Sequence, residues 1–139
     1  MRIDFTKYHV FSRISIYILA LVLICIGVYH LIKPDDLLVY VPYFLPGGIK
    51  WAYLVGTCFV LVGISFIANY YVKVTSYLLA FFLFFFVLTV HVPNYLNAAM
   101  ADMRTFALIN ILNNTAIGAF ALHIAAGAHH QQLHFDESD

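Results

Sequence analysis

The sequence predicts an all-α integral membrane protein in which four transmembrane helices form an up-down bundle. The chain of 139 residues is 63% hydrophobic and only 10% charged, and its mean hydropathy of +0.88 lies outside the range of soluble domains. Its apolar residues are gathered in four runs, each near the roughly 20 residues that a helix needs to cross a bilayer. We therefore expect one membrane domain, residues 1–139, in contact with lipid.

The four apolar runs define the expected helices. They are residues 14–32, 51–69, 74–91 and 105–127. Spanning β-strands are excluded because they alternate apolar and polar residues, whereas residues 81–86 hold five phenylalanines in six positions. The connection at residues 70–73 is a tight turn, so the second and third helices are expected to be antiparallel neighbours. The third connection, residues 92–104, contains Pro93 and is moderately polar.

The first connection, residues 33–50, is long and unusually apolar. Its sequence Pro-Asp-Asp at residues 34–36 predicts a capped helical turn, and the apolar residues 37–41 that follow are too hydrophobic to stay in water. This segment is therefore expected to lie along the membrane surface between the first two helices. Pro46 and the glycines after it end the segment, and Trp51 suits the aromatic belt at a membrane interface.

Charge near the helix ends predicts the orientation. The cations on the amino-terminal side are Arg2, Lys7, Arg13 and Lys73, and those on the other side are Lys33, Lys50 and Arg104. Because positive charge favours the cytoplasm, both termini are expected there, with a short polar, solvated tail at residues 128–139. Seven basic residues balance seven acidic ones, so no net field would attract nucleic acid.

Polar side chains at membrane depth are the first candidates for function, because they are costly there and tend to face the bundle interior. His30 ends the first expected helix, His91 ends the third, and both helices run in the same direction. The two imidazoles are thus expected at similar depth near the outer face. They either converge with Asn94 on a pocket or simply cap their helices, where the helix dipole favours an imidazolium.

The fourth expected helix carries several amides, of which Asn110 and Asn114 share one helix face. Such amides either join helices through hydrogen bonds worth about 1 kcal/mol each or line a cavity for a polar head group. Cys25 and Cys58 are both expected roughly 10 Å below the outer face, as apolar filler or as a redox pair. The two cysteines have no spacing known for zinc. The histidines of the tail are expected to be solvated, and a clustered-histidine metal site there is the less favoured alternative.

Several segments carry a family resemblance. They are GVYHLIKP at residues 27–34, VPYFLP at 41–46, HVPN at 91–94, Trp51, the pair Gly56 and Gly63, and the trio Asn110, Asn114 and Gly118. Over residues 14–127 the chain resembles the DoxX-like family of small four-helix membrane proteins. The resemblance implies a redox-associated protein of the bacterial inner membrane, linked to quinol oxidation or thiol stress. The chain lacks the intramembrane acidic residue of some relatives, which weakens a proton-coupled catalytic role.

Three functions remain open, and no residue is identified as catalytic. The first is a redox-associated accessory or binding subunit, in which His30, His91 and Asn94 line an outer-facing pocket for a quinone-like or other apolar small molecule. The second is a haem protein with both histidines as axial ligands, ranked lower because they lie at helix ends. The third is a non-catalytic structural or assembly subunit of a larger membrane complex or a homo-oligomer.

Overall fold

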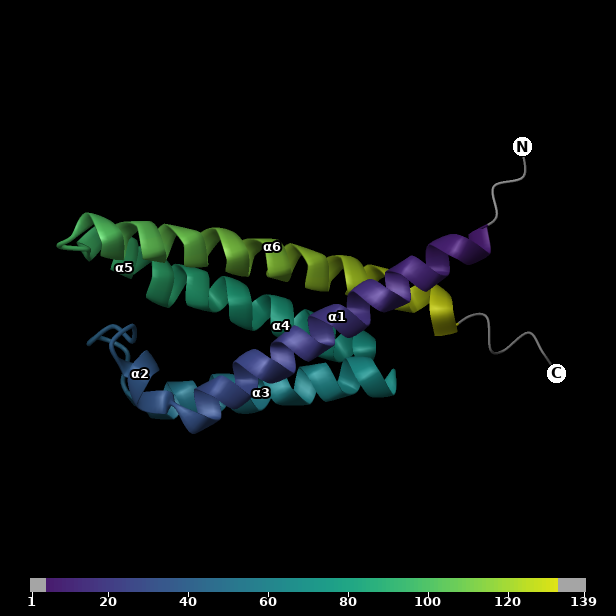
Figure 1. Cartoon of the computed structure of the whole chain (residues 1–139), viewed down its shortest axis with the longest axis horizontal. Coiled ribbons are helices and arrows are strands. Elements are labelled where there is room, and N and C mark those ends of the chain that lie inside the picture. The colour runs from purple at the N-terminus through teal and green to yellow at the C-terminus, as the bar shows by residue number, and fades with distance from the viewer. Residues whose placement is uncertain (1–4, 133–139) are drawn as a thin grey trace.

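The computed structural model describes the backbone of residues 5–132 and the side chains of residues 10–128. Its elements are α1 (Phe5–Ile32), α2 (Pro34–Leu38), α3 (Lys50–Ala68), α4 (Val72–Phe86), the π-helical turn η1 (Val87–His91), α5 (Val92–Asn97) and α6 (Ala101–Gln132) (Figure 1). Four segments are long and apolar enough to cross a membrane: Val10–Ile32, Lys50–Ala68, Val72–Asn97 and Ala101–Ala128. No strand occurs in the described part of the chain. The predicted all-α, four-helix fold class is confirmed.

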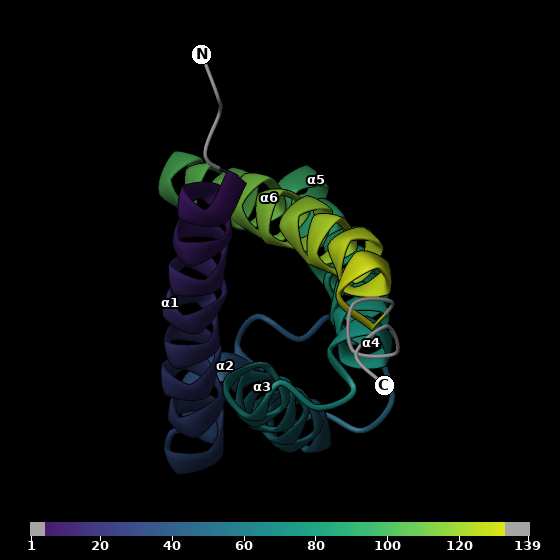
Figure 2. The ribbon, with the colours of Figure 1, turned by 90° about the vertical axis from the view of Figure 1, so that its right-hand side faces the viewer.

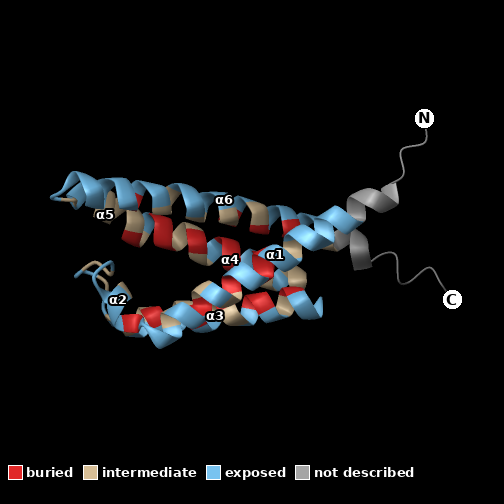
Figure 3. Ribbon diagram, viewed as in Figure 1, coloured by how far each residue is buried: buried red, intermediate tan, exposed pale blue. Residues whose placement is uncertain are grey.

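The helices turn mostly apolar surface outward. In the most apolar window of each candidate span, only 17% to 39% of the residues are buried inside the protein, and Figure 3 shows buried residues confined to the inward sides of the helices. Such apolar exteriors are what lipid contact requires, and the chain is compatible with an integral membrane protein. The start of α1 and the end of α6 lie at one end of the bundle, the terminal end, and α2 lies at the other, the α2 end (Figure 1).

Two helices extend beyond their expected limits. Helix α1 begins at Phe5 instead of residue 14, and α6 covers Ala101–Gln132 instead of 105–127. Hydropathy detects the apolar stretch that crosses the bilayer, whereas a helix also continues through polar residues, and Asp102 suits the dipole in the first turn of α6. The start of the expected polar tail is thus helical, while residues 133–139 lie outside the described part.

Pro93 does not end its helix, so the expected connection at residues 92–104 is wrong. The helix continues through η1 and α5 to Asn97, and only residues 98–100 connect it to α6. Proline lacks an N–H and its ring crowds the preceding turn. The π turn accommodates it, because the N–H of Val92 reaches the carbonyl of Val87, five residues earlier, and the helix is wider there.

Helices α1 and α3 pack through glycines, as their small size predicts. A Cβ added to Gly56 would lie 2.8 Å from the carbonyl oxygen of Gly27, and one added to Gly63 would lie 2.8 Å from the carbonyl oxygen of Ala20. These distances are too short for a side chain, so the two backbones are in direct contact. Gly118 of α6 similarly makes room for the Phe84 ring, 3.0 Å from an added Cβ.

The bundle consists of two helix pairs, α1 with α3 and α4 with α6, joined where α3 meets α4 (Figures 1 and 2). The turn between α3 and α4 uses left-handed backbone at Asn69 and Tyr71, and the Ser65 hydroxyl donates to the carbonyl of Tyr70. The core is formed by Leu19, Ala20, Leu23, Phe59, Val62, Phe66, Leu79, Ala80, Leu83, Ala121 and Ile124. It fills the middle and the terminal end, so the pairs diverge toward the α2 end.

Replacing Ser76 with alanine should stabilise the fold. Ser76 is fully buried, and its hydroxyl has no hydrogen-bond partner among the described residues. Because an unsatisfied buried hydroxyl is costly, Ser76→Ala should raise the free energy of unfolding by about 1 kcal/mol, measured by thermal melting in detergent. Ser65→Ala is the matched control and should lower it, since the Ser65 hydroxyl bonds to Tyr70 and Thr75. An equal decrease in the free energy of unfolding in both variants would contradict the prediction.

Candidate functional site

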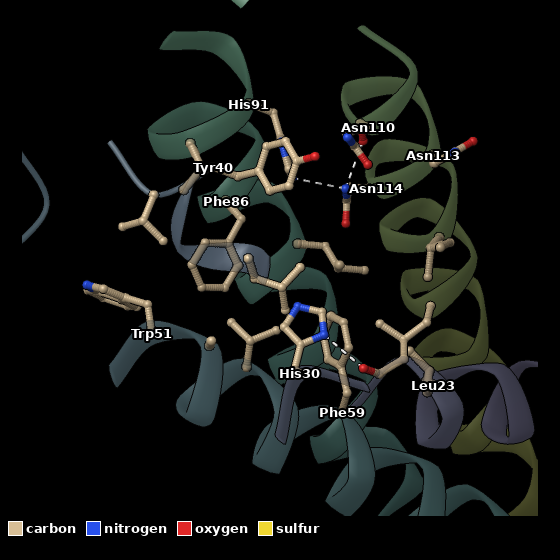
Figure 4. A pocket seen from close by; sticks show the side chains of 18 of the residues that line it. Leu23, His30, Tyr40, Trp51, Phe59, Phe86, His91, Asn110, Asn113 and Asn114 are labelled. Carbon is tan, nitrogen blue, oxygen red and sulfur yellow. Dashed lines mark hydrogen bonds between the residues drawn. The ribbon is translucent and has the colours of Figure 1, made fainter. Parts of the chain in front are cut away.

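A cavity of about 460 Å³ lies between the two helix pairs in the half of the bundle nearest α2. Its volume is within the range of roughly 300–1,000 Å³ typical of small-molecule sites. The lining is mostly apolar, with a few polar groups (Figure 4). The lining residues are Leu23, Ile26, His30, Leu37, Tyr40, Val41, Leu45, Trp51, Ala52, Val55, Phe59, Leu83, Phe86, Val90, His91, Phe106, Asn110, Asn113, Asn114, Ala116 and Ile117.

The segment after α1 covers the cavity at the α2 end, contributing Leu37, Tyr40, Val41 and Leu45 to the lining. Asn94 of α5 donates a hydrogen bond of 2.8 Å from Nδ2 to the carbonyl of Tyr40. The Tyr40 ring also lies 5.2 Å from that of Phe106, between centroids. Trp51 Nε1 donates to the carbonyl of Pro46 at 2.8 Å. These contacts hold the segment across the end of the bundle.

His30 presents an acceptor to the cavity. Its Nδ1 donates a 2.8 Å hydrogen bond to the carbonyl of Ile26, so the proton of the neutral ring is on Nδ1. The other ring nitrogen, Nε2, therefore has a free lone pair, and it points into the cavity (Figure 4). The ring is half-buried and packs edge-on against Phe59, with centroids 6.0 Å apart. Backbone contact between α1 and α3 at Gly56 fixes the helix turn that carries His30.

His91 and Asn114 form a hydrogen-bonded pair on the opposite wall. His91 is the last residue of the π turn, and its Nε2 accepts a 3.2 Å hydrogen bond from Asn114 Nδ2. The proton of the neutral ring is therefore on Nδ1. The second amide hydrogen of Asn114 goes to the carbonyl of Asn110 at 2.8 Å. Both hydrogens are thus used, which leaves the amide oxygen as an acceptor that points into the cavity (Figure 4).

The structure brings together four of the five candidate residues, since His30, His91, Asn110 and Asn114 all line the cavity. The two histidines lie on opposite walls (Figure 4). Asn94 is not among the lining residues and instead anchors the covering segment.

Two other amides of the fourth helix contribute less to the cavity. Asn110 donates to the carbonyl of Phe106 at 3.1 Å. Asn113, at the cavity margin, is exposed and its side chain points away (Figure 4). Sequence reasoning missed the aromatic lining from Phe59 and Phe86, for which no periodic signal exists in helices that are apolar on all sides.

The donor set does not fit bis-histidine ligation of haem. An axial ligand needs a ring-nitrogen lone pair directed at the iron, and the Nε2 lone pair of His91 is taken by Asn114. Cys25 is exposed, Cys58 is half-buried, and both are free thiols. His123 lies far along α6, exposed and stacked on Phe120. Among the described residues, no group of three or more His, Cys, Asp or Glu side chains forms a metal-binding cluster.

No protein-family model, curated protein or solved structure matches the chain significantly. What the chain does must therefore be inferred from the chemistry of its own cavity. That chemistry is an apolar, aromatic-lined space with hydrogen-bond acceptors on both walls.

Proposed function

We propose that this chain is a redox-associated binding or accessory subunit that holds the head group of a quinone-like molecule in the cavity. The observation that supports the proposal most directly is the arrangement of polar groups in the roughly 460 Å³ space, with His30 on one wall and the pair His91–Asn114 on the other. Bundle interiors with a few convergent polar groups are common ligand sites.

The polar groups complement a ring that carries oxygen at two opposite positions. His30 Nε2 and the Asn114 oxygen accept hydrogen bonds, which suits the hydroxyls of a quinol. The Nδ1–H of His91 can donate to a quinone carbonyl. Phe59, Phe86 and Trp51 provide the flat apolar surfaces on which such a ring packs.

A binding role is supported by the lining, because none of its residues is Asp, Glu, Lys or Arg. The two imidazoles in the lining, His30 and His91, are both engaged in hydrogen bonds with the protein. We place the protein in a bacterial inner membrane with both termini cytoplasmic. The greater number of Lys and Arg residues on the amino-terminal side supports this orientation.

The test is ligand-dependent stabilisation of the purified protein. A benzoquinone carrying a decyl tail, in oxidised and reduced forms, should raise the melting temperature of the wild type. The corresponding increase in the free energy of unfolding should approach about 2.7 kcal/mol when the free probe concentration is a hundred times its Kd. The double variant His30→Gln, His91→Gln keeps size and hydrogen-bonding capacity but changes the arrangement of acceptors and donors, so it should lose most of this shift.

The control is His123→Gln, a substitution at an exposed histidine outside the cavity, which should keep the full shift. Equal shifts in the wild type and the double variant would show that the ligand binds elsewhere. If no shift occurs in any protein and the chain co-purifies in a larger complex, the assembly role is correct instead.

A further inference from the structure

We propose that the cavity opens sideways into the bilayer between α1 and α6, and that its ligand is a lipid whose polar head lies inside while a long apolar tail leaves through this gap. The inference rests on the proposed function, because it assumes that a head group occupies the cavity. It adds the class of ligand, a tailed membrane lipid as opposed to a compact soluble molecule, and the route by which it enters.

The helix pairing leaves one side of the cavity without a wall. Helix α1 packs along α3, α6 packs along α4, and α3 contacts α4, whereas α1 and α6 have no extended backbone contact. Looking along the bundle, α1 lies beside α3 and α6 lies beside α4 (Figure 2). Both helices nevertheless line the cavity, with Ile26 on one side and Ile117 on the other.

The exposure of the lining residues locates the opening. Most of them are buried or half-buried, and the exposed ones are Tyr40 in the covering segment and Phe106, Asn113 and Ala116 on α6. Residues that line a cavity and are also exposed mark its rim. The opening therefore runs along the edge of α6, from Ala116 to Phe106, where the Tyr40 ring of the covering segment packs against it. Ala116 lies close to the middle of α6, where the surroundings of a spanning helix are hydrocarbon. Only an apolar group would pass there at low cost.

A ligand could alternatively enter the cavity from water through the α2 end, but the segment after α1 covers that end. The segment over that end is held by the hydrogen bond from Asn94 to the Tyr40 carbonyl and by that from Trp51 to the Pro46 carbonyl. The polar groups His30, His91 and Asn114 lie within the cavity below this cover. Ala116 lies on the exposed rim of the cavity and has only a methyl side chain, so it is the place where a tail attached to a bound head group can leave.

The experiment compares two probes with the same ring, a dimethoxy-methyl-benzoquinone without a tail and the same ring carrying a decyl tail. Ala116→Trp fills the gap, so the tail can no longer leave while the head is bound. Affinity for the decyl probe should fall at least about tenfold, as overpacking costs predict, and affinity for the tailless probe should change much less. Ala119→Trp, exposed on the same helix but outside the cavity lining, is the control and should alter neither affinity.

The outcomes separate this inference from the proposed function. If Ala116→Trp weakens both probes equally, or neither, the tail does not use the gap and the inference is wrong, although head-group binding stands. If neither probe binds the wild type, the proposed function fails and the inference with it. A diazirine at the tip of the decyl tail tests the same point without a substitution. Labelling of α1 and α6 supports the gap, and labelling of residues 33–49 overturns it.

Discussion

Replacing Gly56 with leucine is expected to separate α1 from α3 and to prevent the bundle from folding stably. Even a Cβ at this position would lie 2.8 Å from the carbonyl oxygen of Gly27 and 2.9 Å from the Cβ of His30. One of these neighbours is a backbone atom, which cannot rotate away as a side chain can. A leucine side chain also places three further carbons beyond its Cβ. Overpacking typically lowers the free energy of unfolding by about 1–3 kcal/mol, and by more where backbone must move. Gly56→Leu should therefore lower it by at least about 3 kcal/mol, which is a large part of the total stability of a typical protein.

Gly127→Leu is the matched control, because an added Cβ at Gly127 meets nothing within 4 Å. Both variants place a leucine within a helix, and only the first meets another backbone. Unfolding in increasing SDS can be followed by the fluorescence of Trp51, the only tryptophan of the chain, which lines the cavity. Similar unfolding midpoints for the two variants would show that the glycine contact between α1 and α3 is not required.

This contact also connects the fold to the candidate site. Gly56 lies against the helix turn that carries His30, and Gly27 precedes His30 by one turn. The contact therefore sets how far the imidazole reaches into the cavity. A milder change, Gly56→Ala, would be expected to displace His30 before it unfolds the protein.

The sequence predicted the parts of this structure that depend on composition and helix direction. Four apolar runs of bilayer length leave little choice of fold, and two parallel helices that each end in histidine place His30 and His91 at one end of the bundle. The same logic explains why Asn110 and Asn114 face inward, since a polar amide is costly against lipid. These residues line one cavity in the structure.

Other features of the structure depend on contacts that no pattern in the sequence predicts. Asn94 was expected in the pocket, but its amide bonds to the carbonyl of Tyr40, 54 residues away along the chain. Pro93 was expected in a connection, yet one π turn keeps the helix continuous and determines the direction of His91. The aromatic lining was not predicted because side chains that face lipid and side chains that face a cavity are equally apolar in a membrane helix.

Changing Asn114 to aspartate is expected to weaken binding of the decyl quinone probe while preserving the size of the side chain. The amide nitrogen of Asn114 donates to His91 Nε2 and to the carbonyl of Asn110. A carboxylate has no hydrogen to donate, so the bond to the carbonyl becomes a repulsion. His91 would have to move its proton from Nδ1 to Nε2 to restore a hydrogen bond. Nδ1, which we propose donates to a quinone carbonyl, would then have no hydrogen.

Losing these hydrogen bonds should cost about 1–3 kcal/mol, which corresponds to a roughly 5- to 150-fold increase in Kd. The control is Asn97→Asp, since Asn97 also donates to a carbonyl four residues earlier, that of Pro93, but lies outside the cavity lining. Nitrogen NMR of the imidazoles gives an independent readout, with the proton of His91 on Nδ1 in the wild type and on Nε2 in Asn114→Asp. An unchanged tautomer together with unchanged affinity would show that the His91–Asn114 pair only joins two helices.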